Sequence, residues 1–258
     1  MRWHKIVVAI CLVLTLLSLG QTARATDDQI AREIVDRVAR LYSSKSSVAT
    51  LQMQISGEDG TRDLSMKIWT QGENALARIV RPERDAGTAI LKTGNDIWYY
   101  LPKSNRTIKV PGSTTMTSWM GSDFTIDDLV NGSSLIRDYS ISTSFKGMRD
   151  GVAVYEYSLE PRPGAAVVWG AIVMRIRQAD SMPVYQLYYD EDRKLVRELT
   201  FSEYKTMGGR LIPARVVMKV IDKPDQLTAI EYKDVVFDAP ISEETFSLRD
   251  FFSPRDHQ

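Results

Sequence analysis

Hydrophobic and polar positions change their period once along the chain, near Val48. Before that point, the stretch DDQIAREIVDRVARLY (residues 27–42) carries apolar residues at the spacing of one helix face: Ile30, Ile34, Val38 and Leu41. From Val48 onward, apolar and polar residues alternate, which is the period of a β-strand. The pattern therefore predicts an amphipathic N-terminal helix followed by a long β region.

The alternating stretches are separated by turn signals, as where Leu64, Met66 and Ile68 are followed by Gln-Gly-Glu-Asn at residues 71–74. Counting them predicts about eleven strands joined mostly as hairpins. We expect one mainly β domain, residues 26–258, because no repeat or low-complexity tract divides the chain. A sheet of that size curls or closes, so the helix should cover part of an apolar concave face.

One long segment, between Val110 and Tyr139, lacks alternation. Loops longer than about 12–15 residues in a compact domain are usually functional or disordered. This one is too apolar to be disordered, and its centre reads SWMGSDFTIDDL, residues 118–129. We therefore expect a lid that lies over the concave face.

Three carboxylates in this segment, Asp123, Asp127 and Asp128, raise the question of chemistry. The spacing D-x-x-x-D-D is not that of a calcium loop, and the whole chain has two histidines and one cysteine. A Ser–His triad or a cysteine nucleophile is therefore not expected, although a Ser–Lys dyad stays open without a motif to support it. We expect no enzyme activity, no metal site and no cofactor.

A structural interpretation of the same residues is favoured. Ser122 or Asp123 would cap a short helix that begins near Thr125, with Asp127 and Asp128 in its first turn, where the helix dipole favours negative charge. Gly121 would allow a sharp entry, and the acids would keep the outer side of the lid wet. The apolar residues Trp119, Met120, Phe124 and Leu129 would face inward.

The first 25 residues have the pattern of a secretory signal peptide. Arg2 and Lys5 precede an apolar run from Ile6 to Leu19, and cleavage is expected after Ala25. A retained membrane anchor is the alternative, but the run is shorter than the roughly 20 residues a spanning helix needs. Removing this segment takes three basic and no acidic residues from 33 of each, which leaves a net charge of −3. That balance argues against nucleic acid as a partner.

Three stretches together resemble a known family: VRPERDAGTAIL (80–91), DIWYYLPK (96–103) and GSDFTIDDL (121–129). They look like the outer-membrane lipoprotein-sorting family of LolA-like periplasmic carriers. The resemblance implies an unclosed antiparallel half-barrel with a helical lid, and an apolar cavity that binds acyl chains of lipids or lipoproteins without catalysis. It also implies a periplasmic location and, as partners, an inner-membrane RND-type transporter or an outer-membrane acceptor.

The expected lipid contacts combine the lid with two strands. Met66 and Ile68 come from one strand; on the other, Trp98 and Tyr100 share a face opposite to Ile97 and Tyr99, and the family pattern favours the first pair as cavity lining. Other interpretations stay open at this point. The curved sheet could be filled by its own aromatic residues, and the fold could serve a sensor or adaptor that binds a protein, or an envelope hydrolase.

Overall fold

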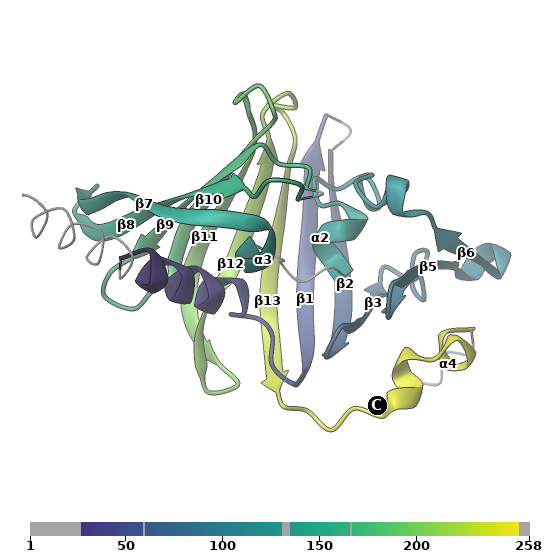
Figure 1. Cartoon of the computed structure of the whole chain (residues 1–258). Helices are drawn as coiled ribbons and strands as arrows, with labels where there is room; N and C mark the ends of the chain where they lie inside the picture. Colours follow the sequence, from purple (N-terminus) through teal and green to yellow (C-terminus); the bar gives the residue numbers. More distant parts are fainter. Residues whose placement is uncertain (1–26, 59, 131–134, 166, 253–258) are drawn as a thin grey trace, which may run out of the picture.

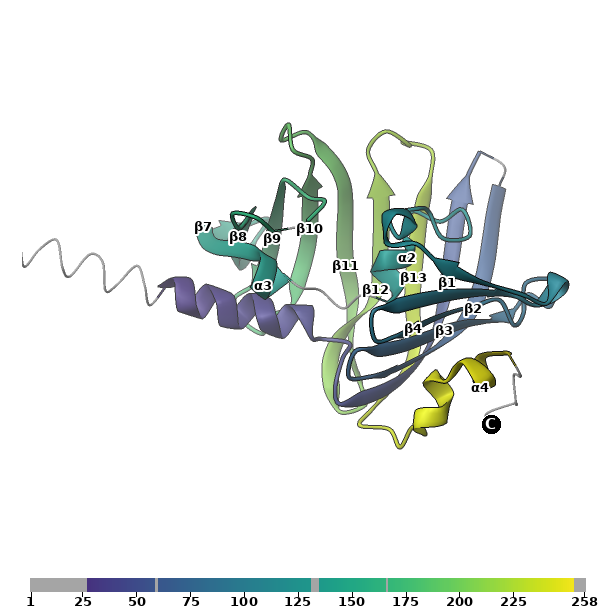
Figure 2. The ribbon, with the colours of Figure 1, turned by 45° about the vertical axis from the view of Figure 1, so that its right-hand side comes forward.

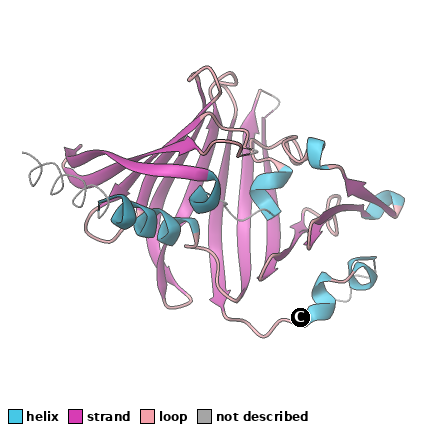
Figure 3. Cartoon of the chain, in the orientation of Figure 1, coloured by secondary structure: helices cyan, strands magenta, loops and turns pink. Residues whose placement is uncertain are grey.

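The computed structural model describes residues 27–58, 60–130, 135–165 and 167–252, and it is dominated by strands (Figure 3). The expected signal peptide therefore lies outside the described residues. The strands are β1 (Ser46–Gly57), β2 (Gly60–Gln71), β3 (Asn74–Arg81), β4 (Ala89–Thr93), β5 (Asp96–Leu101), β6 (Arg106–Val110), β7 (Tyr139–Arg149), β8 (Val152–Pro161), β9 (Ala171–Arg177), β10 (Pro183–Tyr189), β11 (Leu195–Met207), β12 (Arg210–Val220) and β13 (Leu227–Phe237). In the described part of the chain, no helix is both long and apolar enough to cross a membrane.

All 13 strands form one antiparallel sheet, two more than the approximate number expected from the sequence. Short strands such as β4 and β6 have five residues each, too few for alternation to stand out. The order is β6-β5-β4-β3-β2-β1-β13-β12-β11-β10-β9-β8-β7, so two runs of hairpins meet where β1 pairs with β13. Strands β6 and β7 remain as free edges, and the sheet is a strongly curved, unclosed half-barrel, as expected (Figures 1 and 2).

The N-terminal helix, residues 27–39, lies on the concave side of the sheet (Figure 1). Its buried face differs from the expected one, because Ile30 is 47% exposed whereas Ala31 and Val35 are buried. The apolar stripe therefore follows Ala31, Val35 and Val38 at intervals of four and three residues. Just after the helix, Tyr42 stacks on Tyr232 of β13 at 4.4 Å between ring centres.

Two apolar clusters line the concave face. The lid-side cluster includes Leu51, Leu64, Met66 and Ile97, from strands β1, β2 and β5, together with residues of the loop between β6 and β7. The helix-side cluster joins the N-terminal helix to strands β7 to β10, through residues that include Val35, Tyr157, Leu159, Ile172 and Met174. The parts of the concave face that these two clusters form are therefore apolar and covered.

The convex face of strands β2 to β5 has its own cover, the C-terminal segment. It contains η3 (Glu243–Phe246) and α4 (Leu248–Phe252). Phe246 and Phe251 pack against Trp69 and Leu91, which point away from the concave side. Tyr100 joins the same cluster, its ring centre 5.8 Å from that of Phe251. This part of the sheet is thus buried on both faces.

Candidate functional site

Residues 111–130 follow β6 at one free edge of the half-barrel, and residues 135–138 precede β7 at the other; these described residues are called the lid segment below. It contains η2 (Gly112–Thr114), α2 (Ile126–Val130) and α3 (Leu135–Asp138). Helices α2 and α3 lie in front of the concave face of the sheet (Figures 1 and 2).

The centre of the lid segment is a tight turn. The Trp119 N–H donates to the Phe124 carbonyl, and the Ser122 N–H donates to the Trp119 carbonyl, each at 2.9 Å. Met120 and Gly121 both have positive φ, at 54° and 77°. Glycine adopts that conformation without strain, so Gly121 permits the sharp entry that the sequence suggests. The buried Ser122 hydroxyl closes the turn by donating to the Trp119 carbonyl at 2.7 Å.

Apolar side chains of the lid segment pack into the lid-side cluster. Trp119, Phe124, Ile126 and Val130 are all buried, with Trp119 only 1% exposed, and Met120 and Leu129 are partly buried there. Burial of each large side chain is worth about 1.5–3 kcal/mol. Met66 and Ile68 belong to the same cluster, so the structure brings these expected residues together. Whether any of them contacts lipid remains a prediction.

Trp98 and Tyr100 do not belong to this group, contrary to the interpretation of the strand-β5 pattern. Both pack in the convex cluster with the C-terminal segment, whereas Ile97 and Tyr99 face the lid segment. The Tyr99 hydroxyl donates to the Met120 sulfur at 3.1 Å. Both faces of β5 are apolar because both are covered, so alternation could not decide between them.

Asp123 is a buried latch rather than a wet cap. Its side chain accepts hydrogen bonds from the Thr228 hydroxyl at 2.9 Å and from the Gln226 amide at 2.7 Å. The Asp123 N–H in turn donates to the Thr228 hydroxyl oxygen at 2.9 Å. The residue is only 5% exposed. The expectation of a solvated acid was wrong because these partners come from β13 and the turn before it, 103 to 105 residues away.

The cap of α2 also lies two or three residues further along the chain than expected. Thr125, not Ser122 or Asp123, precedes the helix, and its hydroxyl accepts from the Asp128 N–H at 3.1 Å. The Asp128 carboxylate accepts from the Thr125 N–H at 2.8 Å, which completes a reciprocal capping box. Asp127 and Asp128 do occupy the first turn, as expected.

Arg197 on β11 is a residue that the sequence interpretation missed. Its guanidinium contacts the Asp128 carboxylate at 2.9 Å, and its side chain is only 5% exposed. It lies 5.0 Å from the ring centre of Trp169 and 5.4 Å from that of Tyr188. The sequence contains a pattern that could have indicated it: Arg197 alternates in phase with the apolar Leu199 and Phe201, which places all three on the same face of the strand.

A hydroxyl and an amide extend this polar group on the concave face. The Tyr188 hydroxyl donates to the Gln186 side-chain oxygen at 2.7 Å, and Gln186 is buried. Burial raises the pKa of Tyr188, and the negative charge of Asp128 raises it further. Tyr188 therefore stays a neutral donor at physiological pH. The concave face is thus not uniformly apolar, because Asp128, Gln186, Tyr188 and Arg197 form a polar group, the polar seam, that links the lid to β10 and β11.

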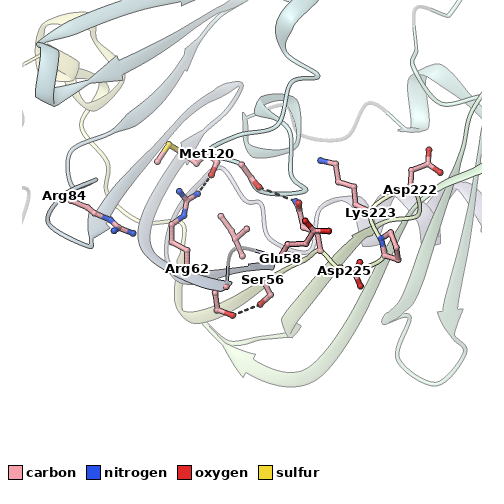
Figure 4. A pocket seen from close by; sticks show the side chains of 15 residues that line it. Ser56, Glu58, Arg62, Arg84, Met120, Asp222, Lys223 and Asp225 are labelled. Carbon is pink, nitrogen blue, oxygen red and sulfur yellow. Dashed lines mark hydrogen bonds between the residues drawn. The ribbon is translucent and has the colours of Figure 1, made fainter.

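The latch lies at the rim where the β1–β2 and β12–β13 hairpins turn. There a pocket of about 670 Å³ is lined by both turns and by Met120 and Gly121. Arg62 donates to the Met120 carbonyl, and Gln226 donates to that of Gly121 at 3.3 Å. Figure 4 shows Arg62 and Met120 on one side of the pocket and Asp222 and Lys223 on the other. The lid turn is therefore fixed to the mouth of the half-barrel from two sides.

Acidic side chains at this site have structural partners. The described residues contain no group of three or more His, Cys, Asp or Glu residues that could hold a metal ion. Asp123 belongs to the latch, and Asp128 belongs to the helix cap and to an ion pair. What the arrangement can do is hold an apolar surface closed and present a buried cation next to it.

Comparisons with known proteins agree with this architecture. A family model with the description "-like: Uncharacterized protein" matches residues 71–251. No match was found among curated proteins. Similar solved structures include a DUF1329 family protein from Desulfovibrio piger, with 20% identity, a TM-score of 0.77, and 87% and 99% of the two chains covered.

Two further structures carry names from lipoprotein sorting. A domain assigned to the outer membrane lipoprotein-sorting proteins, from Vibrio parahaemolyticus, has 22% identity and a TM-score of 0.74 over 87% of this chain and 99% of its own. A LolA superfamily protein from Nitrosomonas europaea has 16% identity and a TM-score of 0.70 over 84% and 97%. The chain therefore belongs to the family of uncharacterized proteins that the matching model defines, and its fold is that of the LolA-like lipoprotein-sorting proteins.

Proposed function

We propose that this protein is a carrier that binds acyl chains of lipids or lipoproteins on its concave face, beneath the lid segment. The observation that carries the proposal is the burial of Trp119 and Phe124 against the lid-side cluster. Those side chains cover an apolar surface that an acyl chain would cover equally well. The likeness in fold to lipoprotein-sorting proteins supports the same function.

The free energy of burying the lid side chains is similar in size to the free energy of burying an acyl chain. Each large apolar side chain that leaves the cluster costs about 1.5–3 kcal/mol. Each acyl CH₂ group that enters gains about 0.8 kcal/mol. A chain of ordinary length therefore offsets the release of several lid side chains, so loading can open the lid and unloading can close it. No disulfide fixes the lid, because the single cysteine of the chain is Cys11.

A truncation inside the lid tests this competition. Phe124→Ala removes an aromatic ring that is buried only when the lid is closed. Such a truncation lowers the stability of a packed core by about 3–5 kcal/mol, so it should destabilise the closed state. Oleate should then bind about tenfold more tightly or better, measured by isothermal titration calorimetry. The matched control is Phe251→Ala, which empties the convex cluster. Equal affinities of wild type and Phe124→Ala, or the same change in the control, would contradict the proposal.

The setting of such a carrier is the bacterial envelope. The N-terminal pattern favours export, and we propose that the protein works in the periplasm, between a donor membrane and an acceptor membrane. An RND-type transporter or an outer-membrane acceptor, as the family resemblance implies, would be its partner there. Osmotic-shock fractionation tests this location: the protein should be released with the periplasmic fraction. Recovery of the protein in the cytosolic fraction would contradict the proposal.

A further inference from the structure

The buried cation of the polar seam constrains what the carrier can bind. Arg197 has one carboxylate partner among the described residues, Asp128 of the lid. Its guanidinium otherwise contacts the Met218 sulfur, at 3.3 and 3.4 Å, and the faces of aromatic rings. Sulfur is a weak acceptor. The one full negative charge that is paired with this buried cation therefore belongs to the lid.

Opening the lid affects the two partners differently. The Asp128 carboxylate also accepts from the Thr125 N–H and hydroxyl, both at 2.8 Å, within the lid itself. It therefore keeps hydrogen bonds wherever the lid goes. Arg197 stays behind on β11 and loses its charged partner, and separating a buried ion pair in this way is costly. An open state needs another oxyanion at Arg197, and a guanidinium pairs well with carboxylate or phosphate.

The position of Arg197 along the strand fits a headgroup site. Arg197 is the third residue of β11 and pairs with Val220, the last residue of β12. The turn that follows Val220 contributes to the pocket at the mouth. Further into the half-barrel, Leu199 and Phe201 continue the same face of β11 and pack in the lid-side cluster. A ligand with its anion at Arg197 would thus extend its chain along apolar residues.

From this geometry we propose that the cargo is an amphiphile with an oxyanion headgroup, a carboxylate or a phosphate, which replaces Asp128 at Arg197 when the lid opens. Asp128 is then an internal substitute for the ligand's headgroup. The inference rests on the proposed carrier function, and it adds a charge requirement that acyl binding alone does not have.

The test compares ligands that share one acyl chain but differ in charge. Oleate is compared with oleyl alcohol, and oleoyl lysophosphatidate with mono-oleoylglycerol, all by calorimetric titration below their micelle concentrations. The wild type should bind each anionic ligand at least about tenfold more tightly than its neutral counterpart. The arm with the larger preference identifies the source of the oxyanion, carboxylate or phosphate.

Three variants test whether Arg197 and Asp128 cause the preference for anionic ligands. Asp128→Asn should bind the anionic ligands more tightly and keep the preference, because the competing carboxylate is gone. The double variant Asp128→Asn with Arg197→Met, which leaves no unpaired charge, should lose the preference while still binding oleyl alcohol, which also shows that it is folded. The matched control is Arg193→Gln at the exposed pair with Glu160, which should behave like the wild type.

Two results would overturn the inference while leaving the carrier function intact. One is a wild type that binds anionic and neutral ligands equally, and the other is a double variant that keeps the preference. If no acyl ligand binds the wild type or any variant, both the inference and the proposed function are wrong.

Discussion

Among single residues, Asp123 gives the most specific prediction. Its carboxylate joins the lid turn to Thr228 and Gln226, and both partners donate hydrogen bonds to it. Asp123→Asn keeps the size and shape of the side chain, but its amide NH₂ group would face either the Thr228 hydroxyl or the Gln226 amide, which are themselves donors. Because a buried polar group left unsatisfied costs about 1–3 kcal/mol, the free energy of unfolding should fall by that amount.

Denaturant titration measures this change. The control is Asp192→Asn on the exposed turn after β10, which should change stability by less than about 0.5 kcal/mol. Equal stability of the wild type and Asp123→Asn would mean that the latch contributes nothing to the closed state.

The residue scale also shows where sequence patterns reach their limit. The lid turn, its glycine and its inward aromatic residues follow from local spacing, and the structure places them as expected. Asp123 could not be assigned to a latch, because Thr228 is 105 residues away and no local pattern links them. Arg197 was visible as a charge in phase with apolar positions, but its partner on the lid was not.

At the scale of elements, Tyr42 adds a polar and an aromatic contact to the apolar packing that holds the N-terminal helix on the sheet. Tyr42 stacks on Tyr232, and its hydroxyl donates to the Pro213 carbonyl of β12 at 2.8 Å. Burial raises the pKa of Tyr42 well above its usual value, and the neighbouring Tyr232 adds to the rise. Ionising this hydroxyl in the folded state is therefore unfavourable.

The pH dependence follows from the sign of that shift. A raised folded pKa of an acid means that its stabilisation is complete below the unfolded pKa, about 10, and is lost as the pH rises above it. Tyr42→Phe should lower stability by about 0.5–1.5 kcal/mol at pH 8 by removing the hydrogen bond. The gap to the wild type should narrow from pH 8 to pH 11, as followed by urea unfolding. A gap that widens with pH would contradict the assignment.

Strands and helices were easier to predict than their arrangement. Alternation and turn signals gave the hairpins, because both ends of a hairpin are close in sequence. The pairing of β1 with β13, which joins the two runs into one half-barrel, is a contact between distant segments and leaves no local pattern. The helix face was misjudged at Ile30 because the adjacent Ala31 is also apolar, and Ala31 is the residue that lies in line with the buried Val35 and Val38.

The whole molecule is a half-barrel whose largely apolar concave face is covered by the lid segment and the N-terminal helix. The lid segment adjoins both free edges, its turn is hydrogen-bonded at the mouth, and its apolar side chains pack in the lid-side cluster. Binding of an acyl chain to that face requires the lid to leave it. The central claim is therefore that opening the lid and loading the cargo are one event.

A reversible covalent lock measures this coupling most directly. The variant carries Asp123→Cys and Thr228→Cys, at positions already joined by hydrogen bonds, in a chain with Cys11→Ser. Mass spectrometry confirms the disulfide, and oleate is titrated into the oxidised and the reduced forms of the same sample. The account predicts binding at least about tenfold weaker in the oxidised form, restored by reduction. Equal affinity of the two forms would show that cargo binds without moving the lid, and it would contradict the account.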